Sequence, residues 1–337
     1  MYYCKKLGVE ILKKTFKILS IDGGGIKGIY SIAVLARLEQ ATGKRIIDCF
    51  DLICGTSTGG LIALLLAAGH SATEIVEFYK ENASIIFPKN IVNLFGIVIG
   101  KAKFDRKPLA SLLKAYLKDK EMKDSYTNLC IPAVDADNEE PMVFKTKHSS
   151  RYTRDSEIKM LDVALATSAA PLYFPKYNIE KINRNTVDGG LCANNPSLIG
   201  VIEFISVISR EQPDYDNFSL LSVGNIEYNT GCFSSLKTPF VYNFSLIKNI
   251  IDLFMKLQNK MLNNITKYLC MAYNADYTRI ANNDLSKDQY GKIKLDSTDN
   301  KVLDLLISKG YKDAEHMEAE IIAKGYFELK NNIQEVK

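Results

Sequence analysis

The sequence predicts an α/β protein, because short apolar strands alternate with helices through the first two thirds of the chain. Residues 16–21 (FKILSI) are typical of a buried strand, and the glycine-rich residues 22–28 (DGGGIKG) follow directly before a helix. A second strand is expected at residues 51–55, followed by GTSTG and by an apolar helix at residues 61–68. Two such strand–turn–helix units favour a sheet covered by helices.

The remaining elements follow from apolar spacing and capping residues. Gly43 ends the first helix, Ser71 and Glu74 form a capping box, and Asn195 and Pro196 suit the N-cap and N1 positions of a later helix. Beyond the two units above, helices are expected at residues 29–41, 71–81, 108–117, 159–167 and 195–209. Further strands are expected at residues 129–134 and 142–145, which would pair as a hairpin, and at residues 185–188 and 218–223.

The character of the chain changes near residue 241. A long amphipathic helix is expected over residues 247–268, and the Lys-, Asp- and Asn-rich remainder is expected to be helical, most clearly at 302–307 and 314–322. We therefore predict an α/β domain over residues 1–235 and a helical C-terminal extension over residues 236–337 packed on it.

Composition narrows the class of protein. The 337 residues are 47% apolar and carry a net charge of +4, which is too balanced to indicate a nucleic-acid polymer as partner but permits contact with anionic lipid. Seven cysteines without a C-x-x-C pair favour buried, reduced thiols rather than disulfides. The N-terminus lacks the apolar core of a secretory signal, and no apolar run reaches the about 18 residues of a membrane span. We expect a cytoplasmic protein.

Ser57 is the first candidate catalytic residue. It lies at the centre of GTSTG between a strand and a helix, the arrangement of a nucleophile elbow, in which Gly55 and Gly59 let the two backbones approach. The alternative is a turn of small residues with no chemistry.

The residues Gly23, Gly24 and Gly25 would place successive backbone N–H groups at a helix N-terminus. Beside an activated serine, these groups and the N–H of Thr58 would form an oxyanion hole. The alternative is a dinucleotide-binding fingerprint formed by Gly23, Gly25 and Gly28, with Asp48 as its acidic partner.

A nucleophilic serine needs a base. The chain has three histidines, His70, His148 and His316, and only His316 follows Asp188 in the Ser–Asp–His order of α/β-hydrolases. The simpler hypothesis is a dyad in which Asp188 itself takes the proton of Ser57. Because the ordinary pKa of aspartate is near 3.9, this requires a dry pocket and a short hydrogen bond. Gly189 and Gly190 permit the close backbone approach that such a hydrogen bond needs. Alone, Asp188 would be an ordinary Asp–Gly turn.

The chain resembles the patatin-like phospholipase family over about residues 17–225. The resemblance is carried by three motifs in the order DGGGIKG, GTSTG and DGG, and by the stretches DVALATSAAPLYFP and VDGGLCANNP. The resemblance implies a three-layer α/β/α sandwich with a mostly parallel central sheet, and lipid acyl hydrolysis without a metal. It implies Ser57 as nucleophile, Asp188 as base and Gly23, Gly24 and Gly25 as oxyanion hole, with Lys27 where the family usually has Arg or Lys.

The compact length, the helical extension and the stretches SAAPLYFP and VDGGLCANNPSLIGV have a narrower resemblance. They resemble bacterial patatin-like effectors of anti-phage signalling, which degrade membrane phospholipid after a cyclic nucleotide switches them on. It implies a cyclic-nucleotide activator rather than a cofactor, and peripheral contact with the membrane. Basic residues that could serve the nucleotide are Lys101, Lys103, Arg106, Arg151 and Arg154. The apolar, lysine-bracketed segment Phe87–Lys103 is a membrane anchor, a lid or a core segment. The sequence leaves open a homo-oligomer, the headgroup and the ester position.

Overall fold

The computed structural model describes residues 14–86, 104–171, 173–226, 244–282 and 299–330, together with Leu285 and Ile293. The predicted membrane anchor, lid or core segment at Phe87–Lys103 lies outside these residues, as do Lys101 and Lys103.

The centre of the molecule is a single sheet that contains eight strands of the described residues, in the order β5-β6-β3-β2-β1-β7-β8, with β4 paired to β3. The strands β2, β1, β7 and β8 run parallel to their neighbours, as does β3 to β2, whereas β4, β5 and β6 form antiparallel pairs. The strands are β1 (Lys14–Ile21), β2 (Leu52–Gly55), β3 (Asn128–Asp135), β4 (Glu140–Lys145), β5 (Tyr177–Ile179), β6 (Arg184–Asp188), β7 (Tyr215–Ile226) and β8 (Asp276–Asn282).

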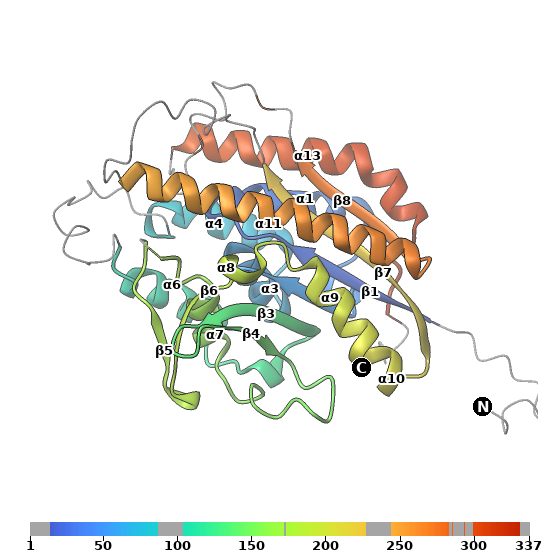
Figure 1. Ribbon diagram of the computed structural model, residues 1–337. Coiled ribbons are helices and arrows are strands. Elements are labelled where there is room, and N and C mark those ends of the chain that lie inside the picture. The colour runs from blue at the N-terminus through green and yellow to red at the C-terminus, as the bar shows by residue number, and fades with distance from the viewer. Residues whose placement is uncertain are drawn as a thin grey trace, which may run out of the picture.

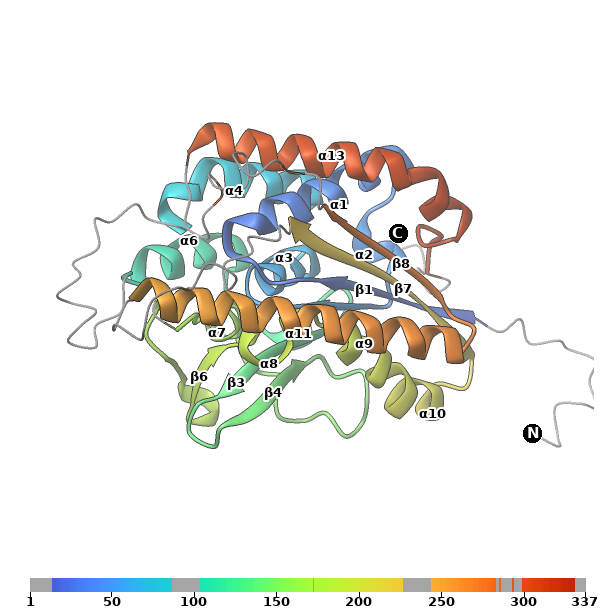
Figure 2. The ribbon, with the colours of Figure 1, turned by 45° about the horizontal axis from the view of Figure 1, so that its top comes forward.

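Helices cover both faces of this sheet and complete the three layers (Figures 1 and 2). One face carries α1 (Gly28–Thr42), α2 (Ile46–Cys49), α3 (Thr58–Ala67), α4 (Ala72–Ile86), α6 (Lys107–Leu117), α7 (Met160–Thr167) and α13 (Asn300–Ala323). The other carries α8 (Gly190–Ala193), α9 (Ser197–Glu203), α10 (Ser209–Glu211) and α11 (Phe244–Ala272). All ten residues of α3 are buried, so this helix lies at the centre of the core.

The predicted three-layer α/β fold with a mostly parallel sheet is therefore confirmed, and its elements differ mainly at their ends. The helix α3 begins three residues earlier than predicted, directly after Ser57, and α4 continues to Ile86. Pro196, rather than Asn195, is the N-cap of α9, which begins at Ser197. The predicted helix to residue 209 passes through a π-helical turn at Phe204–Ile208.

The C-terminal region differs more from the expectation of a helical extension. It contains β8, which the sequence did not predict and which extends the central sheet beyond β7. The two predicted helices at its end form one helix, α13, and Figure 2 shows α13 lying over α1. Because Leu303, Leu306 and Ile321 of α13 belong to the same core as α1 and α3, the C-terminal residues complete the α/β fold rather than pack on it from outside.

The described cysteines are free, and Cys49, Cys54, Cys130 and Cys270 are buried, as the composition predicts. Across the part of the chain that the structure describes, no helix is long and apolar enough to cross a bilayer.

Candidate active site

Ser57 lies on the sharp turn between β2 and α3, which confirms the predicted strand–turn–helix arrangement. Its backbone has φ 53° and ψ −119°, a left-handed conformation that costs a non-glycine residue about 1–3 kcal/mol. A Cβ on Gly55 would lie 2.3 Å from the Gly59 carbonyl oxygen, and a Cβ on Gly59 would lie 2.3 Å from that of Ile21. Both glycines are therefore needed for the close packing that supports this turn.

Asp188 lies at the end of β6 and meets Ser57 directly. The Ser57 hydroxyl donates a hydrogen bond of 2.6 Å to Oδ2 of Asp188, and the Gly190 N–H donates one of 2.7 Å to Oδ1. Burial raises the pKa of the Asp188 carboxyl to about 6, against the lowering effect of these two hydrogen bonds. The carboxyl is therefore ionised at neutral pH and more basic than an aspartate in water.

Thr167, at the end of α7, links the two candidate residues, and sequence reasoning assigned it no role. Its hydroxyl oxygen accepts a 3.0 Å hydrogen bond from the Ser57 N–H and donates one of 2.6 Å to the Pro132 carbonyl. The backbone carbonyl of Thr167 accepts a hydrogen bond from the Gly189 N–H. Two residues further on, the carbonyl of Ala169 accepts one from the Asp188 N–H. One chain segment thus fixes the backbones of both Ser57 and Asp188.

The predicted oxyanion hole needs one correction. The Gly23 N–H donates a 2.9 Å hydrogen bond to the Asn194 carbonyl, so it is not available to an anion. The side chain of Asn225 donates a 2.6 Å hydrogen bond to the Gly23 carbonyl, so both backbone polar groups of Gly23 have partners within the protein. Gly24, Gly25 and Thr58 line the pocket beside Ser57, and their N–H groups remain the candidate donors.

A buried ion pair holds the start of this glycine-rich loop. Asp22 is 1% exposed, and its carboxylate accepts two hydrogen bonds from the guanidinium of Arg279, the shorter being 2.6 Å. Arg279 lies on β8 and also donates a 2.6 Å hydrogen bond to the Ser222 hydroxyl of β7. The C-terminal strand therefore supports the candidate site, a role that no local sequence signal indicates.

The other predicted supporting residues lie close to these groups. A Cβ on Gly28 would lie 2.3 Å from Cγ2 of Thr58, and one on Gly189 would lie 2.2 Å from the Pro132 carbonyl oxygen. Lys27 ends the short helix η2 (Gly25–Lys27) that leads into α1. Asp48, the acidic partner in the dinucleotide alternative, lies on α2 and does not line the pocket at Ser57, so the structure does not favour that alternative.

An apolar pocket opens beside Ser57 and Asp188. Its walls come from α3, α6, the loop after α7 and α11, and two of its residues, Ile86 and Phe104, immediately flank the undescribed residues 87–103. The apolar side chains around it include Leu61, Ile86, Phe104, Leu109, Phe174, Ile251 and Met255. A pocket of this composition suits a hydrocarbon chain next to the serine.

The three histidines do not reach this site in the described residues. His316 is exposed on α13 and does not line the pocket, and Nε2 of His70 lies 3.1 Å from the Tyr116 carbonyl oxygen. His148, expected in a polar loop, has a side chain that is only 2% exposed, and its Nε2 lies 2.9 Å from Oε1 of Glu203. With both Asp188 oxygens bound to other groups, the described geometry does not form the Ser–Asp–His triad.

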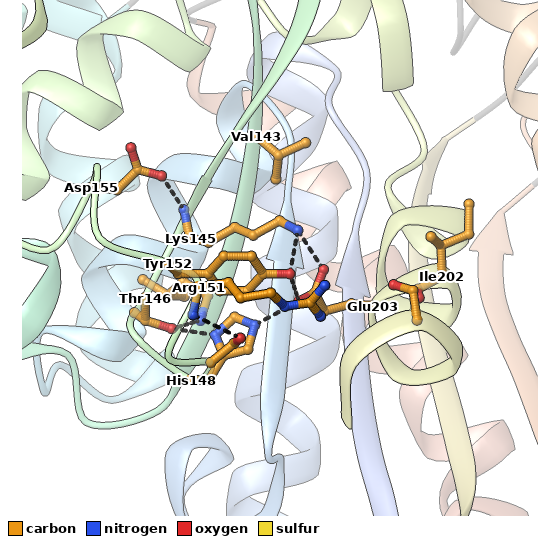
Figure 3. A network of polar contacts seen from close by, with 12 residues as sticks. Val143, Lys145, Thr146, His148, Arg151, Tyr152, Asp155, Ile202 and Glu203 are labelled. Atoms are coloured by element: carbon orange, nitrogen blue, oxygen red, sulfur yellow. Dashed lines mark hydrogen bonds and ion pairs between the residues drawn. The ribbon is translucent and has the colours of Figure 1, made fainter. Parts of the chain in front are cut away.

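Figure 3 shows the network that holds His148. Glu203 of α9 accepts hydrogen bonds from His148, Lys145 and Tyr152, at 2.9, 2.6 and 2.5 Å. Burial by itself would raise the pKa of Glu203, but these three bonds outweigh it and lower the pKa to about 2. Cys130, His148 and Glu203 have potential metal-ligating atoms within 4.8 Å of one another. The Lys145 ammonium contacts the same Glu203 carboxylate and would repel a metal ion bound there. The network instead links β4 and the loop that follows it to α9.

The basic residues considered for a nucleotide have partners on different elements. The guanidinium of Arg106 stacks 4.9 Å from the ring centre of Tyr177, that of Arg151 pairs with Glu211, and that of Arg154 pairs with Asp155. These contacts do not gather the three arginines into one nucleotide pocket.

Comparisons with known proteins identify similar chains. A family model described as patatin-like phospholipase matches residues 19–199, which is more than half of the chain. A cGAMP-activated phospholipase of Vibrio cholerae is 36% identical over 234 residues, covering 64% of this chain and 66% of that protein. One of Escherichia coli is 36% identical over 225 residues, covering 64% and 63%. The chain thus spans slightly less than two thirds of the length of these curated relatives.

Among solved structures, VipD from Legionella pneumophila is similar with a TM-score of 0.44 and 12% identity, over 91% of this chain and 67% of that one.

Proposed function

Because the chain belongs to the patatin-like phospholipase family, we propose that it is a serine hydrolase that cleaves fatty-acyl esters of membrane glycerophospholipids. The observation that carries the proposal is the 2.6 Å hydrogen bond from the Ser57 hydroxyl to the buried Asp188 carboxylate, at the edge of an apolar pocket. This arrangement joins a nucleophile, a base and space for an acyl chain.

In the proposed reaction, Asp188 takes the proton of Ser57 as Oγ attacks the ester carbonyl carbon. The N–H groups of Gly24, Gly25 and Thr58 stabilise the negative charge that develops on the carbonyl oxygen. Asp188 then gives the proton to the departing glycerol oxygen, which leaves an acyl–Ser57 ester. Asp188 next takes a proton from water as the water attacks that ester, and it returns this proton to Oγ of Ser57 as the fatty acid leaves. Each step is assigned to a protein group, so the proposal uses no metal or cofactor.

The raised pKa of Asp188 supports its role as base. A carboxyl that titrates near 6 is ionised at neutral pH, yet it binds a proton more readily than an aspartate with the ordinary value of 3.8. The apolar pocket walls, which exclude water from the carboxyl, are also the surfaces that an acyl chain would contact.

We further infer that a cyclic nucleotide activates the enzyme, in anti-phage defence at the cytoplasmic side of the membrane. The support is the similarity to the Vibrio cholerae and Escherichia coli proteins, which are named cGAMP-activated phospholipases. The nucleotide would act as an activator, separate from the groups that carry the reaction.

The test is release of free fatty acid from phospholipid vesicles, measured with and without cGAMP. We expect Ser57→Ala and Asp188→Ala each to lower the rate at least about 1,000-fold, because removal of either member disables a nucleophile–base pair. His316→Ala is the control and should keep the wild-type rate. A His316→Ala rate as low as that of Ser57→Ala would contradict the dyad, and release of no fatty acid by the wild type under either condition would contradict the hydrolase.

A further inference from the structure

The outer face of α11 carries a row of exposed apolar side chains. These side chains are 36–68% exposed, although all except one tyrosine belong to residue types that usually pack in a core. Their positions repeat every three or four residues, which places them along one side of the helix. This row, called the α11 stripe below, consists of Phe254, Leu257, Met261, Ile265, Tyr268 and Met271. A contiguous apolar surface of this kind marks a site of contact with a partner or a membrane.

The charge beside the stripe has one sign. Between Leu253 and Ala272, α11 contains lysines and no aspartate or glutamate. Lys260 and Lys267 are exposed, and their positions place them on the flank of the helix next to the stripe. An apolar row beside lysines is the pattern of a helix that lies in the headgroup region of an anionic bilayer.

The same helix forms part of the candidate active site. Ile251 and Met255 of α11 line the apolar pocket beside Ser57, on the side of the helix that faces the body of the protein. Phe254 and Leu257 of the stripe are their near neighbours in the chain. Figures 1 and 2 show α11 as a long outer helix that runs past α8 and α9, with which it is in contact. A surface bound by the stripe would therefore lie next to the pocket.

We propose that the α11 stripe docks the protein on an anionic phospholipid surface and brings the pocket wall to the lipid. This inference rests on the proposed function, because only an enzyme that takes its substrate from a bilayer gains from a docking surface at its pocket. With the stripe in the headgroup region, an acyl chain passes from the bilayer to the pocket along the edge of α11 and remains away from water.

A second copy of the chain is the competing occupant, because the stripe spacing also suits packing of one helix on another. Pairing two α11 stripes would bring the lysine flanks of both copies to one interface, and residues 253–272 of α11 supply no acidic residue to balance them. An anionic membrane supplies that missing negative charge, so the charges favour lipid over self-association.

The experiment measures co-sedimentation with vesicles made of equal parts phosphatidylglycerol and phosphatidylcholine, in the presence of cGAMP. The proteins carry Ser57→Ala so that the vesicles stay intact. We expect Leu257→Asp and Met261→Asp each to weaken binding about tenfold, because each removes inserted apolar area and adds a repelled charge. Ile322→Asp is the matched control. Ile322 is 48% exposed on α13, in the opposite helical layer, and its replacement should not change binding.

Hydrolysis of a soluble short-chain ester by the same variants with Ser57 intact separates docking from catalysis. Unchanged ester hydrolysis with weakened vesicle binding supports the proposal. Equal binding by all variants, or no vesicle binding by a protein that still hydrolyses the ester, overturns docking and leaves the proposed function standing. If Leu257→Asp or Met261→Asp abolishes a dimer seen by light scattering but leaves vesicle binding unchanged, the docking proposal is overturned, and a second copy of the chain is the occupant of the stripe. Absence of hydrolysis of either ester or lipid by the wild type contradicts the proposed function itself.

Discussion

Burial makes the Asp188 carboxylate a better base and also lowers the free energy of unfolding of the protein. Its pKa in the folded protein is about 6, above the ordinary 3.8, because burial disfavours the charge. Below about pH 4 the carboxyl is protonated in both the folded and the unfolded protein, and its full contribution to stability is present. As the pH rises through 6 the buried carboxyl must ionise, and this contribution is lost. At neutral pH the ionised group therefore costs up to about 3 kcal/mol.

Asp188→Asn should remove this cost together with the activity. The amide oxygen can still accept from the Gly190 N–H, and the amide nitrogen can donate to Ser57, so no buried group loses its partner. We expect the variant to gain about 1–3 kcal/mol in free energy of unfolding at pH 8 and to gain little at pH 4. Urea unfolding at the two pH values measures the difference. A variant less stable than the wild type at pH 8 would show that the native carboxylate is not under strain.

Residues of the site differ in how far the sequence could predict them. Ser57 and Asp188 lie in short motifs whose glycines permit close backbone approach, so local sequence carries the signal. Thr167 and Asn225 act on backbone groups 110 and 202 residues away, through single hydrogen bonds. A threonine or asparagine has no local pattern that reveals such a distant partner. For the same reason, the contact of the Gly23 N–H with Asn194 emerged only from the fold.

At the level of elements, the predicted strands and helices before residue 226 are present because their apolar spacing is clear. The exception at the C-terminus has a physical cause. Every second residue of β8 from Thr278 is buried, but two of these three are polar, Thr278 and Asn282, and only Ile280 is apolar. The alternation that predicts a half-buried strand is therefore hidden in the sequence.

The strand β8 matters to the site through Arg279. Arg279→Ala would leave the Asp22 carboxylate, which is 1% exposed, without its guanidinium partner. We expect a loss of about 3–5 kcal/mol in free energy of unfolding and lower hydrolysis, because the start of the glycine-rich loop is no longer held. The double variant Asp22→Asn/Arg279→Met removes both charges and should recover part of the stability. Thermal unfolding compares the three proteins. A single variant as stable as the wild type would mean that the ion pair does not hold the loop.

For the whole molecule, the question is whether residues 1–235 form a domain without the residues after them. The described structure favours one cooperative unit. Leu303, Leu306 and Ile321 are at most 1% exposed in the core shared with α1. The Tyr326 hydroxyl donates a 3.0 Å hydrogen bond to the Leu220 carbonyl of β7, the strand between β1 and β8. Loss of a single buried leucine or isoleucine side chain costs about 2–5 kcal/mol, and domains are stable by only about 5–15 kcal/mol.

A chain ending at residue 235 should therefore fail to fold, since it loses α11, β8 and α13 together with Arg279, which pairs with Asp22. We expect no cooperative thermal transition and no hydrolysis of a soluble short-chain ester. A chain ending at residue 330 keeps every described helix and strand and is the matched control, with the transition and ester activity of the full chain. Calorimetry and the ester assay on both proteins measure this. A 1–235 chain with a cooperative transition and ester activity would establish an independent catalytic domain and refute the single unit.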